Sequence, residues 1–215
     1  MSERNVEIKA RIDDLDNTRK AVRELVSGAA PQITMQTDTY FKYDRGRMKL
    51  RETRGSSPVC ELIVYERPDT PHPCISRYDI FPVNDPEAMM CDLSQSLGVV
   101  SVVRKVRELY FYRNVRIHLD QVDGLGSFLE LEAVVPAGQF PQAGEELVNE
   151  LLSVLRIDSA RLVEGSYSDM VEQLNLPRLR PSSTWSPGRR GGPTGANLRV
   201  TGVPRCCART RSSLY

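Results

Sequence analysis

Apolar and ionisable residues alternate along several short segments of the chain. Residues 5–11 (NVEIKAR) show this pattern first, and residues 47–51, 116–120 and 128–132 repeat it. Successive side chains of a β-strand point to opposite faces, so each segment should carry its charges on one face and its apolar residues on the other. One such strand is typical of a solvated surface. Four of them, with clustered bases and acids, favour charged faces that meet around a polar cavity.

The same reasoning along the whole chain predicts roughly eight strands and three or four helices. The strands are predicted at residues 3–11, 32–43, 47–53, 59–67, 74–83, 99–113, 115–122 and 127–134. The helices are predicted from 15 to about 28, from 84 or 85 to about 97, and at 145–155 and 167–174. Consecutive strands joined by short turns pair antiparallel. The predicted class is α+β, an eight-stranded antiparallel tunnel or barrel with a polar lumen and flanking helices.

The C-terminal part of the chain has a different composition. Residues 178–215 hold eight of the 29 bases and none of the 28 acids, so residues 1–177 carry 21 bases against 28 acids. This composition predicts a folded domain over 1–176 and a disordered basic tail, rich in Arg, Pro, Gly and Ser, over 177–215. An inert tail is favoured over one that docks on the acidic body, RNA or an acidic membrane. Nucleic acid is not expected as a partner except through this tail.

The rest of the composition limits where the protein works. The chain has no run of about 18 apolar residues, and no apolar segment follows its N-terminus, so neither a membrane span nor a secretory signal is expected. The five cysteines have no metal-binding spacing and are expected to be reduced thiols. These features favour a cytoplasmic protein, and they do not indicate an oligomeric state.

Basic residues share faces on the predicted strands. Arg47, Lys49 and Arg51 lie on one face of their strand, as Lys105 and Arg107 do on theirs. Like charges on a strand face repel each other, and such an arrangement persists when a multiply charged anion binds among them. A solvated outer face is the alternative, and it is equally favoured for any one strand alone.

Acidic residues form a second pattern. Glu130 and Glu132 share a face, and Glu7 shares a face with Lys9. Carboxylates at positions i and i+2 converge on one site and suit Mg²⁺ or Mn²⁺, which prefer oxygen ligands. The alternative is a strand surface with ordinary salt bridges. Together the two patterns point to a site for an oligophosphate with a divalent metal.

In order along the chain, these segments resemble the CYTH superfamily, the triphosphate tunnel metalloenzymes. The first strand resembles that family's Glu-x-Glu-x-Lys signature, with Asn5 in place of the first acid. The resemblance continues through residues 36–41 (QTDTYF), 49–52 (KLRE), 65–68 (YERP), 104–110 (RKVRELY), 116–132 and 166–169, so that it spans about residues 3–175.

The resemblance implies an eight-stranded antiparallel tunnel that binds a triphosphate along its axis together with Mg²⁺ or Mn²⁺. By this resemblance the metal-binding residues are Glu7, Glu130 and Glu132, with Asp120 close by, and the catalytic residues are Glu7, Lys9, Glu130 and Glu132. The substrate-binding residues it implies are Lys9, Lys49, Arg51, Arg67, Lys105, Arg107 and Arg116.

The implied function is metal-dependent hydrolysis of a triphosphate-containing small molecule, such as inorganic triphosphate, a nucleoside triphosphate or thiamine triphosphate. Two alternatives stay open. One is a class IV-type adenylate cyclase that makes cyclic AMP and pyrophosphate from ATP. The other is a non-catalytic module that binds polyphosphate or nucleotide.

Several positions depart from the family pattern or have more than one interpretation. Asn5 offers a carbonyl oxygen but no charge and cannot act as a base. Ile63 stands where some hydrolytic relatives carry a further lysine. His118 lies two positions before Asp120, so both side chains should point to the inner face of the strand. A structural histidine held by hydrogen bonds is favoured there over a histidine that acts as an acid, a metal ligand or a gate.

Overall fold

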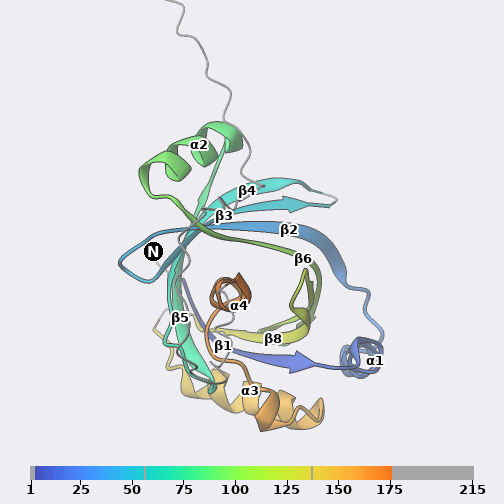
Figure 1. Cartoon of the computed structure of the whole chain (residues 1–215). Helices are drawn as coiled ribbons and strands as arrows, with labels where there is room; N and C mark the ends of the chain where they lie inside the picture. Colours follow the sequence, from blue (N-terminus) through green and yellow to red (C-terminus); the bar gives the residue numbers. More distant parts are fainter. Residues whose placement is uncertain (1–2, 56, 137, 176–215) are drawn as a thin grey trace, which may run out of the picture. The chain divides into compact units, whose positions relative to one another are not determined.

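The computed structural model describes residues 3–55, 57–136 and 138–175. Their eight strands form a closed barrel in the order β1-β5-β4-β3-β2-β6-β7-β8, and every neighbouring pair is antiparallel (Figure 1). The strands are β1 Glu3–Ile12, β2 Gln32–Phe41, β3 Arg47–Arg54, β4 Val59–Glu66, β5 Cys74–Pro82, β6 Val99–Tyr112, β7 Val115–Val122 and β8 Gly126–Val134. The predicted fold class is confirmed. The tail predicted over 177–215 lies outside the described residues.

The helices are α1 Leu15–Leu25, α2 Pro86–Ser96, α3 Gln142–Val154 and α4 Tyr167–Asn175, with a short 3₁₀ turn at Ser159–Arg161. Asp14 caps α1 and Asp85 caps α2, in each case because its carboxylate accepts a hydrogen bond from a backbone N–H of the first turn. Helix α3 begins three residues before its predicted start, at a Pro141 cap that makes no side-chain hydrogen bond.

The apolar core lies outside the barrel wall. The alternate residues of β1, β7 and β8 that face away from the lumen pack with residues of α1 and α3, and they include Val6, Ile117 and Leu131, all fully buried. Helix α3 lies close against this wall at Gly144. A Cβ added at this glycine would lie only 3.3 Å from side-chain atoms of both Ala133 and Val6. The side chains on the opposite faces of the same strands are therefore turned into the barrel.

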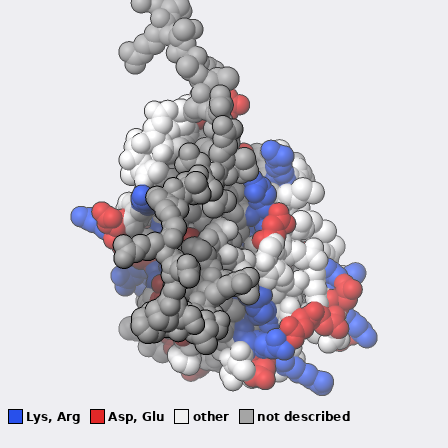
Figure 2. All heavy atoms as spheres, viewed as in Figure 1, with Lys and Arg blue, Asp and Glu red and all other residues white. Residues whose placement is uncertain are grey.

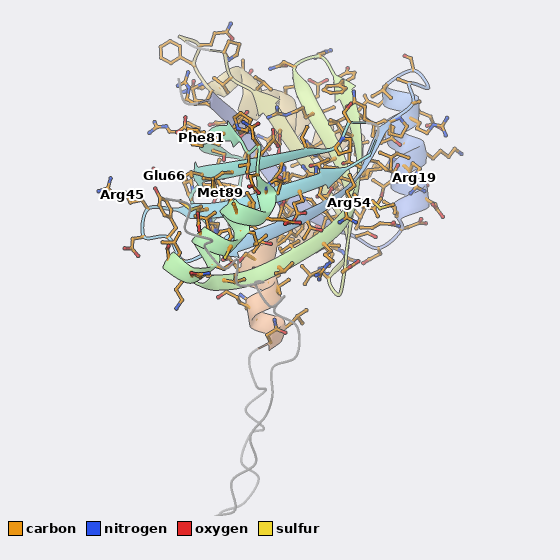
Figure 3. All side chains as sticks on the ribbon, turned by 90° about the horizontal axis from the view of Figure 1, so that it is seen from above. Arg19, Arg45, Arg54, Glu66, Phe81 and Met89 are labelled. Atoms are coloured by element: carbon orange, nitrogen blue, oxygen red, sulfur yellow. The ribbon has the colours of Figure 1, made fainter. Side chains whose placement is uncertain are left out.

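Helix α4 lies across one end of the barrel. It appears within the ring of strands in Figure 1 and extends from one end of the barrel in the perpendicular view of Figure 3. Tyr167, its first residue, packs edge-on against Phe128 with ring centroids 5.0 Å apart. Tyr40, Val103 and Val122 join the same buried cluster. This end of the lumen is therefore filled by side chains.

The outer surface carries charges of both signs. Lysines and arginines lie interspersed with aspartates and glutamates on the face drawn in Figure 2. None of the described helices is long and apolar enough to cross a lipid bilayer.

Candidate functional site

A polar cavity of about 300 Å³ occupies the lumen of the barrel. All eight strands contribute lining residues at alternate positions, and Ser166 and Tyr167 line it from the α4 end. The cavity opens at the other end, where its lining residues Gln32 and Ile80 are exposed to solvent. The period-two pattern of charge in the sequence thus corresponds to an inward face on each strand.

The structure brings all seven predicted substrate-binding residues to this cavity: Lys9, Lys49, Arg51, Arg67, Lys105, Arg107 and Arg116 line it. Arg47 shares the strand face of Lys49 and Arg51 but does not line the cavity. It lies at the start of β3, and its guanidinium donates at 2.8 Å to Asp69 and to Asp169.

Asp38 organises three of these bases, and the sequence patterns did not identify it. Arg51 donates to its two carboxylate oxygens at 2.7 Å each, Lys49 donates at 3.1 Å, and the ammonium of Lys105 lies 3.9 Å away. Asp38 is fully buried. Burial alone would raise the pKa of Asp38, but Arg51, Lys49 and Lys105 outweigh it and hold the pKa well below its usual value. Asp38 is thus an ionised carboxylate that holds three cations at the lumen.

Asp120 plays a comparable part on the other side of the lumen. It accepts two hydrogen bonds from Arg107 at 2.7 and 2.6 Å, and one from the Tyr167 hydroxyl at 3.0 Å. Lys105 lies 3.5 Å from the same carboxylate and so bridges Asp120 and Asp38. The ammonium of Lys105 is also 5.1 Å from the centroid of the Tyr167 ring.

Glu7, Glu130 and Glu132 form the carboxylate cluster that could hold a metal ion. Each offers an oxygen within 4.8 Å of the others, and Asp120, the fourth predicted ligand, does not belong to this group. Burial raises the pKa of Glu7, and repulsion from Glu130 and Glu132 raises it further. A divalent cation relieves this kind of crowding, so the three residues fit Mg²⁺ or Mn²⁺.

Bases surround this carboxylate cluster. Arg67 donates to Glu7 at 2.8 Å, Lys9 lies 3.1 Å and Arg107 3.0 Å from Glu130, and Arg116 donates to Glu132 at 2.9 Å. The anion-binding and cation-binding groups therefore lie in direct contact. An anion that draws the bases away would leave the carboxylates free for a cation, which is how a metal complex of an oligophosphate would bind.

Asn5 and His118 line the cavity with polar atoms that are not satisfied. Asn5 is 2% exposed, and its Oδ1 has no hydrogen-bond partner among the described residues. Neither ring nitrogen of His118 has such a partner in the described part of the chain, and its Nε2 lies 3.5 Å from Glu132. The sequence predicts a hydrogen-bonded structural histidine. The structure places the His118 ring at the lumen beside Glu132, which also accepts a hydrogen bond from Arg116.

Two lysines of the cavity have pKa values low enough for their charge to change near neutral pH. Burial and the nearby Arg51 lower the pKa of Lys49 to about 8, and burial and Arg107 lower that of Lys105 to about 7. A bound polyanion favours the charged form of both lysines. Binding of the polyanion should therefore be accompanied by proton uptake in this pH range.

We expect triphosphate binding to take up protons at pH 8, because Lys105 is then mostly neutral in the free protein and becomes charged in the complex. At pH 6 both lysines are already protonated and this uptake should disappear. Titration calorimetry in two buffers of different ionisation enthalpy measures the number of protons. Lys105→Met should remove most of the uptake at pH 8, and an unchanged value would mean that this lysine is charged throughout.

The structure is a closed antiparallel barrel whose lumen is lined by both bases and carboxylates. The CYTH domain model matches residues 3–167, and the chain belongs to the CYTH family. A Methanocaldococcus jannaschii protein named "Putative adenylate cyclase" is 27% identical over 175 residues, which cover 77% of this chain and 97% of that protein.

Solved structures share the fold. The PH1012 protein of Pyrococcus horikoshii superposes with a TM-score of 0.68 at 23% identity, covering 77% of this chain and 98% of that one. A protein from Hippeastrum, described as a "putative adenylyl cyclase" with "a dominant triphophatase activity", has the same fold. It superposes with a TM-score of 0.56 at 14% identity, and the match covers 83% of this chain and 98% of that one.

Proposed function

We propose that the protein hydrolyses a triphosphate-containing small molecule in the barrel lumen, with Mg²⁺ or Mn²⁺ as cofactor. The observation that carries the proposal is the meeting of seven bases and a three-carboxylate cluster in one cavity. The bases match the charge of an oligophosphate of about four negative charges, and arginine meets phosphate oxygens through two parallel hydrogen bonds.

The residues of the lumen have distinct parts in this reaction. Lys49, Arg51 and Lys105 are held by Asp38 so that their remaining donors face the cavity. Fixed donors of this kind stabilise the charge that develops on phosphate oxygens without reorganising during the reaction. Lys9 lies between Glu130, at 3.1 Å, and the Tyr167 ring, at 4.4 Å from its centroid, where it can contact the substrate and the metal cluster.

A metal ion held by Glu7, Glu130 and Glu132 would supply a Lewis acid that neutralises phosphate oxygens and polarises the attacked phosphorus. Helix α4 and the buried Tyr167 exclude water from one end of the lumen. The attacking water in this proposal enters from the open end.

Cyclisation of ATP is the second candidate, and the name of the Methanocaldococcus jannaschii relative favours it. It needs the same triphosphate binding, but the ribose 3′-hydroxyl then attacks the α-phosphate and pyrophosphate leaves. The Hippeastrum protein is described as a putative adenylyl cyclase, but its dominant activity is that of a triphosphatase. Hydrolysis is the function that we propose, and binding without turnover is the third candidate.

The deciding experiment incubates the protein with inorganic triphosphate, ATP or thiamine triphosphate, each with Mg²⁺ or Mn²⁺, and resolves the products. We expect metal-dependent release of phosphate. Pyrophosphate together with cyclic AMP would establish the cyclase instead. Binding without any product would establish a binding module, and no binding at all would contradict a triphosphate site.

A further inference from the structure

The start of α4 supplies Ser166 and Tyr167 to the lining of the lumen. Tyr167 is 3% exposed, and its hydroxyl donates to Asp120 at 3.0 Å. The ammonium groups of Lys9 and Lys105 lie 4.4 and 5.1 Å from the centroid of the Tyr167 ring. An aromatic face attracts a cation, so the place of this ring helps to fix both lysines. The positions of these two bases therefore depend on how the first turn of α4 is held.

A reciprocal pair of hydrogen bonds closes this first turn. The backbone N–H of Ser166 donates to Asp169 Oδ2 at 2.6 Å, and the N–H of Asp169 donates to Ser166 Oγ at 3.3 Å. Ser and Asp three positions apart at a helix start form a capping box in this way. The preceding Gly165 has a φ of +75°, and a Cβ there would lie 2.8 Å from Asp169 Oδ2. The carboxylate of Asp169 therefore shapes the start of the helix.

Arg47, at the start of β3, binds the same carboxylate. Its guanidinium donates to Asp169 Oδ2 and to both carboxylate oxygens of Asp69, each at 2.8 Å. Asp69 lies in the loop between β4 and β5, whereas Asp169 lies on α4. Arg47 itself does not line the cavity. It thus links the barrel wall to the capping box of α4 without reaching the substrate site.

Arg67 makes a second link to the start of this helix. It donates to the Gly165 carbonyl at 2.5 Å and to Glu7 at 2.8 Å. Because Arg67 also lines the cavity, it belongs to the candidate substrate site itself. Arg47 is the link whose substitution changes the helix start while the residues that line the lumen are kept.

The rest of α4 is docked by contacts that do not involve Arg47. Tyr167 packs edge-on against Phe128, and a buried hydrogen bond of 2.7 Å joins Ser168 to Ser101. The two carboxylate partners of Arg47 have side chains that are 53% and 37% exposed, and ion pairs with such groups contribute little to stability. Loss of Arg47 should therefore leave the helix docked and change chiefly the orientation of its first turn.

We propose that Arg47 is a positioning residue of the proposed reaction, which acts through Asp169 on the first turn of α4 and hence on Tyr167. The inference rests on the proposed function, because Lys9 and Lys105 need defined places only if they act on a triphosphate. The other five bases that line the cavity remain to bind the substrate, so ground-state binding is kept when Arg47 is lost. Displacement of groups that act in the transition state lowers turnover instead.

The test measures kcat and KM of the full chain, with Mg²⁺ or Mn²⁺, for the triphosphate that the wild type hydrolyses fastest. We expect Arg47→Met to lower kcat by about tenfold to a hundredfold and to leave KM within about threefold. Arg47→Lys keeps a charge beside Asp169 and should lie between Arg47→Met and the wild type. Asp69→Asn is the matched control, because it weakens the other contact of Arg47, and it should leave kcat within about twofold.

Hydrogen exchange of α4 gives a readout that does not depend on turnover. Its amides, such as that of Met170, which donates to the Ser166 carbonyl at 3.3 Å, should exchange faster in Arg47→Met, whereas those of the strands should not. Unchanged exchange in α4, a raised KM with unchanged kcat, or an equal loss of kcat in Asp69→Asn would overturn the positioning role. If the wild type hydrolyses no triphosphate, the proposed function fails and a role of Arg47 in turnover fails with it. The exchange result would still decide whether Arg47 holds the helix.

Discussion

Asp38→Asn should lower the free energy of unfolding by about 3–5 kcal/mol, the usual cost of removing one partner from a buried ionic cluster. The substitution keeps the size of the side chain but leaves Lys49, Arg51 and Lys105 crowded without their shared counter-charge. Urea unfolding of both proteins at pH 7 measures the difference. Asp79→Asn, an exposed aspartate on β5, is the control and should change stability by less than about 0.5 kcal/mol.

Triphosphate should restore much of this lost stability, because it replaces the missing negative charge. The thermal shift produced by saturating inorganic triphosphate should therefore be larger for Asp38→Asn than for the wild type. Equal shifts would mean that these three bases do not contact the ligand.

The stability that Asp38 contributes should also depend on pH. The pKa of Asp38 is depressed in the folded protein, so this contribution is fully present above the unfolded pKa of about 3.9 and declines as pH falls below it. The difference between wild type and Asp38→Asn should accordingly be largest near pH 6, decline toward pH 8 as Lys105 and Lys49 lose their charges, and shrink under acid conditions.

Glu130→Gln should reduce turnover by about 10²–10³-fold, the usual effect of removing an electrostatic group that acts in the transition state. It should also abolish the rise in melting temperature that Mn²⁺ produces in the wild type, because one of three clustered carboxylates is lost. Thermal-shift titrations with Mn²⁺, with and without triphosphate, measure this directly. Glu132→Gln should behave in the same way.

Glu108→Gln is the matched control for this experiment. Glu108 is also buried and paired, with Arg19 and Tyr110, but it does not line the cavity. Its substitution should lower stability without changing the response to Mn²⁺. If the three variants respond to Mn²⁺ like the wild type, the carboxylate cluster binds no metal.

Period-two patterning explains why so much of the fold could be predicted. Each strand exposes one face to the lumen and one to the helices, so polar and apolar residues alternate without interruption in segments such as 5–9. The predicted start of α3 is wrong because Pro141 makes no side-chain cap hydrogen bond that a sequence pattern could indicate. The three-residue turn at Ser159–Arg161 is too short to have a detectable period.

The part of the site that escaped prediction depends on contacts between strands. Asp38 is a single acid between two threonines, and its role arises because β3 and β6 bring three bases to it. The pattern that could have identified Asp38 is its position on β2, where it shares the inward face with Gln36 and Tyr40. Arg47 was predicted to share the strand face of Lys49. Its partners Asp69 and Asp169 lie 22 and 122 residues away in the sequence, so the pattern of the strand alone could not indicate them.

Among the described residues, helix α4 covers the inner end of the lumen, and this has a consequence for the order of events in the proposed reaction. Ser166 and Tyr167 are buried at the inner end, whereas Gln32 and Ile80 are exposed at the other. In that reaction substrate would enter, and products would leave, through the open end of the lumen. Whatever fragment forms nearest α4 leaves last, after the fragment at the entrance has departed, so the inner fragment should act as a product inhibitor that competes with fresh substrate.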